Sequence, residues 1–228
     1  MPYPPENPFN NSTRHDVYLY TNKAGATDTE YVQFGWWNSY SDHDGTIESS
    51  LPDGELSRVS MTPYATGNSE AYPELHDGDN HVAKGTASYS GHAVGLYARK
   101  IQNVYREGGQ FAATVTFSAD FSATRDTSQG DPEPKEQFLT VISGQITNFK
   151  NDQGNVIDSS WTVPLSRFAH DYADQGEALF RGPSGWNYLF HGAIAGDSTN
   201  MAPNSIIGTF EHSFTNGEVA GAYAASKQ

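Results

Sequence analysis

The run Gly85-Thr-Ala-Ser-Tyr-Ser-Gly91 is followed, after one histidine, by Ala93-Val-Gly-Leu-Tyr-Ala98. Similar alternation, often cut by glycine, returns in Gln110-Phe-Ala-Ala-Thr-Val-Thr-Phe-Ser-Ala-Asp-Phe121, Val141-Ile-Ser-Gly-Gln-Ile-Thr-Asn-Phe149, Ile207-Gly-Thr-Phe210 and Val219-Ala-Gly-Ala-Tyr-Ala224. Alternation places every second side chain on one face of a strand, and glycine within a strand marks a bend, a bulge or a close backbone approach. Many short strands with no helical stretch between them predict a small antiparallel barrel.

The full pattern predicts an all-β protein: an eight-stranded antiparallel β-barrel preceded by a small β-rich, handle-like region. A change in composition at residues 74–80 divides the chain into residues 1–80, an extended arm and the handle-like region, and residues 81–228, the barrel. Before the boundary we expect strands near 17–20, 31–37 and 56–61. After it the expected strand segments are 85–91, 93–100, 110–122, 138–149, 159–168, 177–182, 186–195, 205–214 and 217–225. Because segment ends are blurred by a few residues, this count fits eight strands or nine.

Charge and composition limit the classes of partner. The 228 residues carry 13 basic and 27 acidic side chains, a net charge of −14, which repels phosphate backbones and argues against nucleic-acid binding. There is no cysteine, so the chain has no disulfide, thiolate metal site or thiol nucleophile. No apolar run approaches the roughly 20 residues of a transmembrane helix. No signal peptide is visible in residues 1–15, which are rich in proline and asparagine.

Two clusters of histidine and aspartate are candidates for a divalent-cation site. They are Asp42-His-Asp-Gly45 and His76-Asp-Gly-Asp-Asn-His81. The candidate ligands are His43, Asp44, His76 and Asp79. Neither cluster completes the run of oxygen ligands and the distal glutamate of a calcium loop. Asp-Gly pairs are also ordinary turn residues, so a plain turn is the alternative interpretation.

Exposed aromatic side chains are the other candidates for binding. Trp36 and Trp37 are adjacent in an expected strand and must point to opposite faces of it. With Tyr40 and Trp186 they form the predicted binding set, because tryptophan and tyrosine dominate binding hot spots. The alternative is that the tryptophans cap the barrel or fill the seam between the handle-like region and the barrel.

Motifs for catalysis are weak. The chain has no Gly-x-Ser-x-Gly elbow, no His-Glu-x-x-His pair and no glycine-rich phosphate loop after a strand. His92 and His191 fall in expected strands, where a buried, hydrogen-bonded histidine is the common case and haem ligation in an apolar cleft is the alternative. We therefore expect no enzymatic activity and no obligatory cofactor, with haem or a divalent cation as the two candidates.

The barrel motifs together resemble those of the transferrin-binding protein B-like family, including factor H-binding protein-like barrels. The resemblance covers about residues 83–225 and rests on five motifs in order: 85–97, 111–121, 142–149, 207–210 and 220–224. It implies an eight-stranded barrel filled with side chains, preceded by a smaller handle. Members of that family are bacterial surface lipoproteins that bind host proteins or carry haem. This chain has no cysteine for lipid attachment and one barrel-like region rather than two.

Two functions follow as hypotheses. The first is a non-enzymatic, surface-associated binding protein that captures a protein or small ligand, such as haem, an iron protein or a glycan, through loops and exposed aromatic residues. The second is a structural or assembly subunit of an extracellular particle that docks through the N-terminal arm, residues 1–14. Both place the protein outside the cell or at its surface.

Overall fold

The structure is a computed structural model that describes the backbone of residues 13–23, 31–41, 59–67, 76–77, 80–126, 136–165, 167–170, 180–181 and 187–228. Side chains are described for residues 32–36, 62–67, 82–122, 140–165 and 188–228. Every regular element in these ranges is a β-strand, so the all-β prediction is confirmed. Within the described ranges, no helix of the length and hydropathy required to cross a bilayer is found.

A small antiparallel sheet is formed by β1 (Thr13–Lys23), β2 (Tyr31–Ser41) and β3 (Val59–Gly67), in that order. A short pair, β4 (His76–Asp77) and β5 (Asn80–His81), follows. The third strand of the sheet begins three residues later than the expected 56–61 and ends at Gly67. Its sequence, Val-Ser-Met-Thr-Pro-Tyr-Ala-Thr-Gly, is a weak strand signal because proline removes one hydrogen-bond donor.

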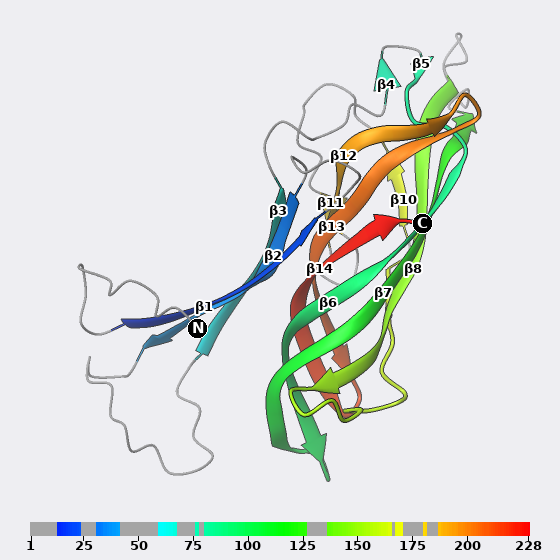
Figure 1. Cartoon of the computed structure of the whole chain (residues 1–228). Helices are drawn as coiled ribbons and strands as arrows, with labels where there is room; N and C mark the ends of the chain where they lie inside the picture. The colour runs from blue at the N-terminus through cyan, green and yellow to red at the C-terminus, as the bar shows by residue number, and fades with distance from the viewer. Residues whose placement is uncertain are drawn as a thin grey trace.

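A large sheet of nine strands contains the rest of the described strands (Figure 1). Its strands are β6 (Thr86–Ile101), β7 (Val104–Asp126), β8 (Glu136–Asn151), β9 (Val163–Pro164), β10 (Arg167–His170), β11 (Phe180–Arg181), β12 (Asn187–Asp197), β13 (Asn200–Phe214) and β14 (Gly217–Lys227). The order is β10-β8-β7-β6-β14-β13-β12-β11, with β9 also on β8, and every pairing is antiparallel. The first long strand therefore pairs with the last.

The expected strand boundaries differ from the observed ones in one informative place. Residues 85–91 and 93–100, expected as two strands, form the single strand β6. The glycines inside it mark close approach rather than an end. A Cβ added at Gly95 would lie 2.0 Å from the carbonyl oxygen of Ala220 and 2.6 Å from the Cα of Gly221 in β14. The β6–β14 contact therefore depends on glycine at this position.

The large sheet curls so that distant strands face each other. Phe121 of β7 and Phe190 of β12 have ring centroids 5.2 Å apart, although four strand steps separate them in the sheet order. Phe149 of β8 and Phe214 of β13, also four steps apart, are 6.3 Å apart. Neighbouring strands are about 4.8 Å apart, so four steps across a flat sheet would span about 19 Å. The contacts require a strongly curved sheet with one enclosed face.

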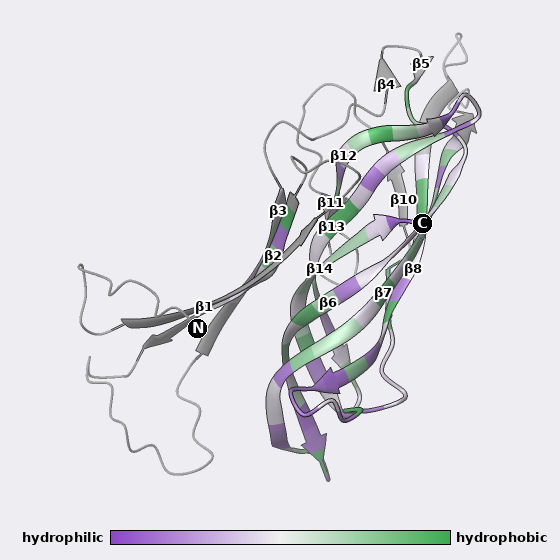
Figure 2. Cartoon of the chain, in the orientation of Figure 1, coloured by the Kyte–Doolittle hydropathy of each residue, from purple (hydrophilic) through white to green (hydrophobic). Residues whose placement is uncertain are grey.

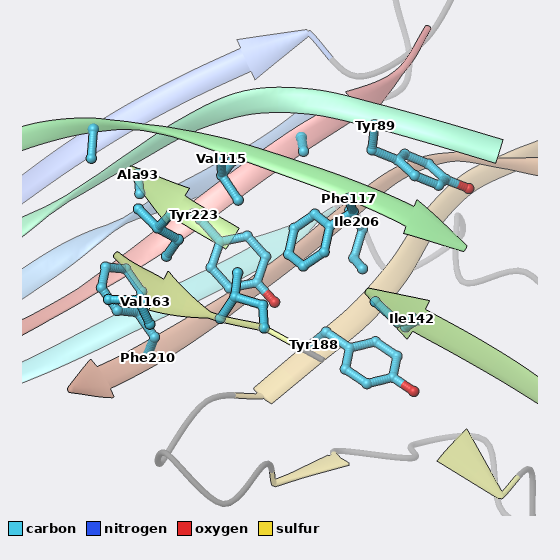
Figure 3. Packing of buried hydrophobic residues seen from close by; sticks show 14 of the residues in the cluster. Tyr89, Ala93, Val115, Phe117, Ile142, Val163, Tyr188, Ile206, Phe210 and Tyr223 are labelled. Carbon is cyan, nitrogen blue, oxygen red and sulfur yellow. The ribbon is translucent and has the colours of Figure 1, made fainter. Parts of the chain in front are cut away.

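The enclosed face is packed with side chains that follow the predicted alternation (Figure 3). It includes Tyr89, Ala93, Val115, Phe117, Ile142, Ile206, Phe210 and Tyr223, all nearly or fully buried. Phe117 and Tyr223, on β7 and β14, have ring centroids 5.3 Å apart, so aromatic rings meet across the interior. The two ends of the sheet order, β10 and β11, are consecutive in the chain, and among the described residues no pairing joins them.

The small sheet packs on the outer face of the large one. Val32, Phe34 and Trp36 of β2 share a buried apolar cluster with outward-facing residues of the large sheet. Those residues are Val94 of β6, Ile207 of β13, and Ala222 and Ala224 of β14. Because residues of β14 alternate, Tyr223 fills the interior while the flanking alanines face the small sheet. We call this cluster the seam.

Candidate functional site

Trp36 lies in the seam. Its side chain is 0% exposed, and it packs with Phe34 of the same strand and with the small outward side chains of Ala222 and Ala224. Alanine at those two positions leaves room for a large ring between the sheets. Trp36 therefore fills the seam between the handle-like sheet and the large sheet, which was the alternative interpretation, and it is not accessible to an external partner in this arrangement.

For the other members of the predicted aromatic set, the structure describes at most the backbone. Trp37 and Tyr40 lie on β2, where they pair in register with Val17 and Arg14 of β1. Their side chains are outside the described residues, and so is the whole of Trp186. The structure thus brings Trp37 and Tyr40 onto the strand that carries Trp36 but leaves their roles as predictions.

The predicted metal ligands are not brought together in the described part of the chain. His76 lies on β4, paired with His81 of β5, while His43, Asp44 and Asp79 lie outside the described residues. Among the residues that are described, no group of three or more histidine, aspartate or glutamate side chains is arranged to hold a metal ion. The metal site stays a prediction.

His191 of β12 lies beside Gly67, the last residue of β3. It is fully buried on β12, and a Cβ added at Gly67 of β3 would lie 2.0 Å from its Nε2 atom. The imidazole is therefore packed against the backbone at the end of β3, and an iron atom on Nε2 would need that backbone to move away. His92, by contrast, is an exposed residue of β6. Haem ligation by either histidine stays a prediction.

One end of the large sheet, which we call the hairpin end, is closed by Trp161. Its ring stacks on Phe214, with centroids 4.6 Å apart and an interplanar angle of 10°, and meets the edge of Phe149 at 6.1 Å. The indole Nε1 donates a hydrogen bond of 2.8 Å to Oδ1 of Asn216. Trp161 is 2% exposed, so it caps the interior, as the alternative interpretation of the tryptophans expected.

A polar network surrounds this cap. Asn216 donates through Nδ2 to the Asp158 carboxylate at 2.8 Å, and Arg99 donates to the same oxygen at 3.5 Å. Arg99 also donates to Glu107 at 3.3 Å, and the Tyr97 hydroxyl donates to Glu107 at 3.1 Å. Burial and the bond to Glu107 raise the pKa of Tyr97 to about 12. These charged groups are engaged with one another, which is the arrangement of a structural network.

The network predicts a dependence of stability on acid. The Ser160 hydroxyl and amide, with Asn216 and Arg99, hold the pKa of Asp158 below its usual range. A lowered pKa stabilises the fold above the ordinary aspartate value of about 3.9 and loses this contribution as the pH falls. Asp158→Asn is expected to lower the free energy of unfolding by about 1 kcal/mol near pH 7. The difference from wild type should shrink below about pH 4, and urea unfolding at several pH values measures it.

The control for this prediction is Asp152→Asn, a change of the same charge at an exposed position on the same loop. It should leave the free energy of unfolding within about 0.5 kcal/mol of wild type. A difference between Asp158→Asn and wild type that stayed constant from neutral to acid pH would contradict the role of the carboxylate.

The opposite end of the large sheet, the loop-bearing end, is held by backbone contacts. Lys84 and Met201 exchange backbone hydrogen bonds of 2.7 and 3.0 Å, and the Phe121 amide donates to the Gly85 carbonyl at 2.8 Å. The β12–β13 turn is fixed by the Asp197 carboxylate, which accepts from the Thr199 hydroxyl at 2.7 Å and from the Thr199 and Asn200 amides at 2.9 Å. These bonds tie three separate segments into one frame.

Comparisons with models of protein families, with curated protein sequences and with solved structures each gave no match.

Proposed function

We propose that the large sheet closes into an eight-stranded antiparallel barrel of the transferrin-binding protein B-like type. We further propose that the protein is a non-enzymatic binding protein outside the cell or at its surface. Its ligand would be a protein or a small ligand, of which haem, an iron protein and a glycan are the candidates. The resemblance of the barrel motifs to that family supports this proposal together with the arguments below.

Closure of the barrel is supported by the strand order. The order runs β10-β8-β7-β6-β14-β13-β12-β11, and only residues 171–179 separate the two end strands in the chain. The short pieces β9 and β10 both pair with β8, and counting them as one strand leaves eight. An antiparallel ring of eight strands has an interior just wide enough for side chains to fill. This matches the aromatic contacts across the interior.

The filled interior is the observation that carries the proposed mode of binding. Phe117, Phe210 and Tyr223 are 4% exposed or less, and Phe210 and Tyr223 have ring centroids 6.4 Å apart. Trp161 covers the hairpin end. With the core occupied in this way, a ligand must bind to the outside of the barrel rather than inside it, in contrast to barrels that enclose a small molecule.

The loop-bearing end is the surface that we propose for the ligand. β7 ends at Asp126 and β8 begins at Glu136 at this end, which also carries the frame formed by Lys84, Gly85 and Met201; residues 127–135 join the two strands in the sequence. Figure 1 shows the β12–β13 turn and the β4–β5 pair at the same end. Binding residues are commonly carried on loops that a rigid scaffold positions, and the frame supplies such a scaffold.

Thermal unfolding with a panel of haem, iron-loaded host proteins and glycans tests the proposal. A specific ligand at about a hundredfold its Kd should raise the melting temperature by about 5–10 °C. Replacing residues 127–135 with a glycine–serine segment of equal length should abolish that shift while the free protein melts as before. The Asp152→Asn variant is the control and should keep the full shift.

Three results would contradict the proposal: no shift with any member of the panel, an unchanged shift after the loop replacement, or turnover of a bound molecule. The assembly hypothesis depends on residues 1–14, of which only residues 13 and 14 lie within the described backbone. Light scattering distinguishes the assembly hypothesis from the binding proposal. Assembly requires association that increases with protein concentration, whereas the binding proposal expects none without ligand.

A further inference from the structure

The exposed large apolar side chains of the described residues gather at the hairpin end. They are Ile101, Val104 and Tyr105, each about half exposed, and Val156 at 53%. Three of the four lie at the tip of the β6–β7 hairpin, which forms the lowest point of the large sheet in Figure 1. Single exposed apolar residues are ordinary on a protein surface. Three within five residues at a projecting tip are not scattered in that way.

The tip is built by a tight turn. Gln102 and Asn103 have φ values of 54° and 63°, the left-handed conformation at both central residues of a two-residue type I′ turn. The turn sets Ile101 directly opposite Val104, and Lys100 opposite Tyr105. The two pairs face opposite sides of the hairpin. Apolar groups are thus presented on both faces of a short, well-defined projection.

The charge at the tip is opposite to that of the whole chain. Residues 99–106 contain three of the 13 basic residues and no acidic one, in a chain of net charge −14. The Lys100 ammonium lies 4.8 Å from the centre of the Tyr105 ring, and Arg106 is exposed. Arg99 is bonded to Glu107 and Asp158, which partly neutralises those two carboxylates behind the tip. Figure 2 shows hydrophilic and hydrophobic residues side by side there.

We propose that this hairpin tip docks on an anionic lipid surface, with Ile101, Val104 and Tyr105 entering the interfacial region and Lys100 and Arg106 contacting the headgroups. Interfacial binding depends on buried apolar area together with attraction of basic residues to anionic lipid. Tyrosine is favoured at the boundary between headgroups and acyl chains. The tip supplies all three features in one projection.

Two magnitudes favour lipid over a folded protein as the occupant. The exposed apolar area of three half-covered side chains is on the order of a few hundred Å², against about 800 Å² per partner in a stable protein interface. Attraction to the membrane acts within a Debye length of about 8 Å at physiological salt. The basic residues of the tip are therefore attracted to the headgroups, while salt screens the repulsion between the membrane and most acidic residues of the chain.

The test is binding of the full chain to vesicles at physiological salt. Because the chain has no cysteine, Val104→Cys accepts a single environment-sensitive fluorophore at the tip, and Ser198→Cys accepts one at the opposite end. Vesicles of phosphatidylglycerol and phosphatidylcholine should shift the emission of the first label to the blue and leave the second unchanged. Vesicles of phosphatidylcholine alone should bind far less.

Unlabelled variants separate charge from apolar contact. Lys100→Gln with Arg106→Gln should lower vesicle binding about 25-fold, about fivefold for each basic residue. Lys84→Gln with Lys227→Gln, at the loop-bearing end, changes the net charge equally and should leave binding unchanged. Ile101→Ser with Val104→Ser should reduce binding at least tenfold although all basic residues remain. All of these positions are at least partly exposed, and circular dichroism verifies the fold.

Several results would overturn the proposal. These are no binding of the wild type to anionic vesicles, equal losses in the tip and control charge variants, and a blue shift at the Ser198→Cys label. Self-association of the wild type that Ile101→Ser with Val104→Ser abolishes would assign the tip to a second copy of the chain instead. None of these results bears on the ligand panel, which tests the loop-bearing end.

Discussion

Replacing Trp36 with alanine is expected to lower the free energy of unfolding by about 3–5 kcal/mol, as for other fully buried large aromatic residues. The indole is fully buried between two sheets, and its removal leaves a cavity lined by Phe34, Ile207, Ala222 and Ala224. Domains of this size are stable by only about 5–15 kcal/mol, so the change removes a large part of the total. Urea unfolding followed by far-ultraviolet circular dichroism measures it.

Tyr105→Ala is the matched control for Trp36→Ala. It removes a comparable aromatic ring from a half-exposed position on the β6–β7 hairpin and should cost less than about 1 kcal/mol. Trp36→Phe should cost less than Trp36→Ala because the ring still fills part of the seam. If Trp36→Ala and Tyr105→Ala had similar small effects, the packing of the small sheet on the large one would be wrong.

Gly95→Ala is expected to cost about 3 kcal/mol or more, and Gly95→Val more again. The added methyl group would lie 2.0 Å from the carbonyl oxygen of Ala220, a backbone atom that cannot rotate away as a side chain can. The clash can be relieved only if β6 and β14 separate, and this separation breaks the pairing of the first long strand with the last. Thermal and urea unfolding measure the loss, and aggregation during expression is the expected sign of the larger substitution.

Gly109→Ala provides the control on the neighbouring strand β7, where Gly109 lies opposite Tyr97 of β6. A Cβ at this exposed position would meet only the Tyr97 ring, at 3.6 Å, which is ordinary contact. The substitution should be neutral or stabilise the protein by a few tenths of a kcal/mol, because alanine reduces the freedom of the unfolded chain. Equal effects of Gly95→Ala and Gly109→Ala would show that β6 and β14 do not approach as closely as described.

Much of the fold was predictable because alternation is a local property. The inward set of β7, from Phe111 through Phe121, follows from period-two spacing alone. The fusion of 85–91 with 93–100 was not predictable in the same way. A glycine that ends a strand and a glycine that lets two strands approach look alike in the sequence. They differ only in what a Cβ would meet, which depends on Ala220 more than 120 residues away.

The roles of the tryptophans show the same limit. The sequence requires Trp36 and Trp37 to point to opposite faces, but the covered face depends on what packs against β2. A signal was present in Ala220, Ala222 and Ala224, which alternate with inward residues on the last strand. A row of small outward side chains predicts a surface that another element covers closely. Read together with the adjacent tryptophans, that row would have predicted the seam.

The polar network at the hairpin end could not be predicted from the sequence for a related reason. Asp158 lies 58 residues from Asn216 and 59 from Arg99 in the chain. Each is an unremarkable polar residue near a turn, and nothing local marks it as a partner of the others. The contacts follow only once the large sheet curls and brings the ends of β6, β8 and β13 together.

The curled sheet is tested most directly by nuclear Overhauser contacts between aromatic rings. Phe121 and Phe190 have ring centroids 5.2 Å apart, and Phe149 and Phe214 have ring centroids 6.3 Å apart. With selectively labelled phenylalanine we expect cross-peaks between the ring protons of both pairs. A flat sheet would separate each pair by about 19 Å and give none. Absence of both cross-peaks, with the contacts between neighbouring strands intact, would contradict the enclosed core and the exterior binding that we derive from it.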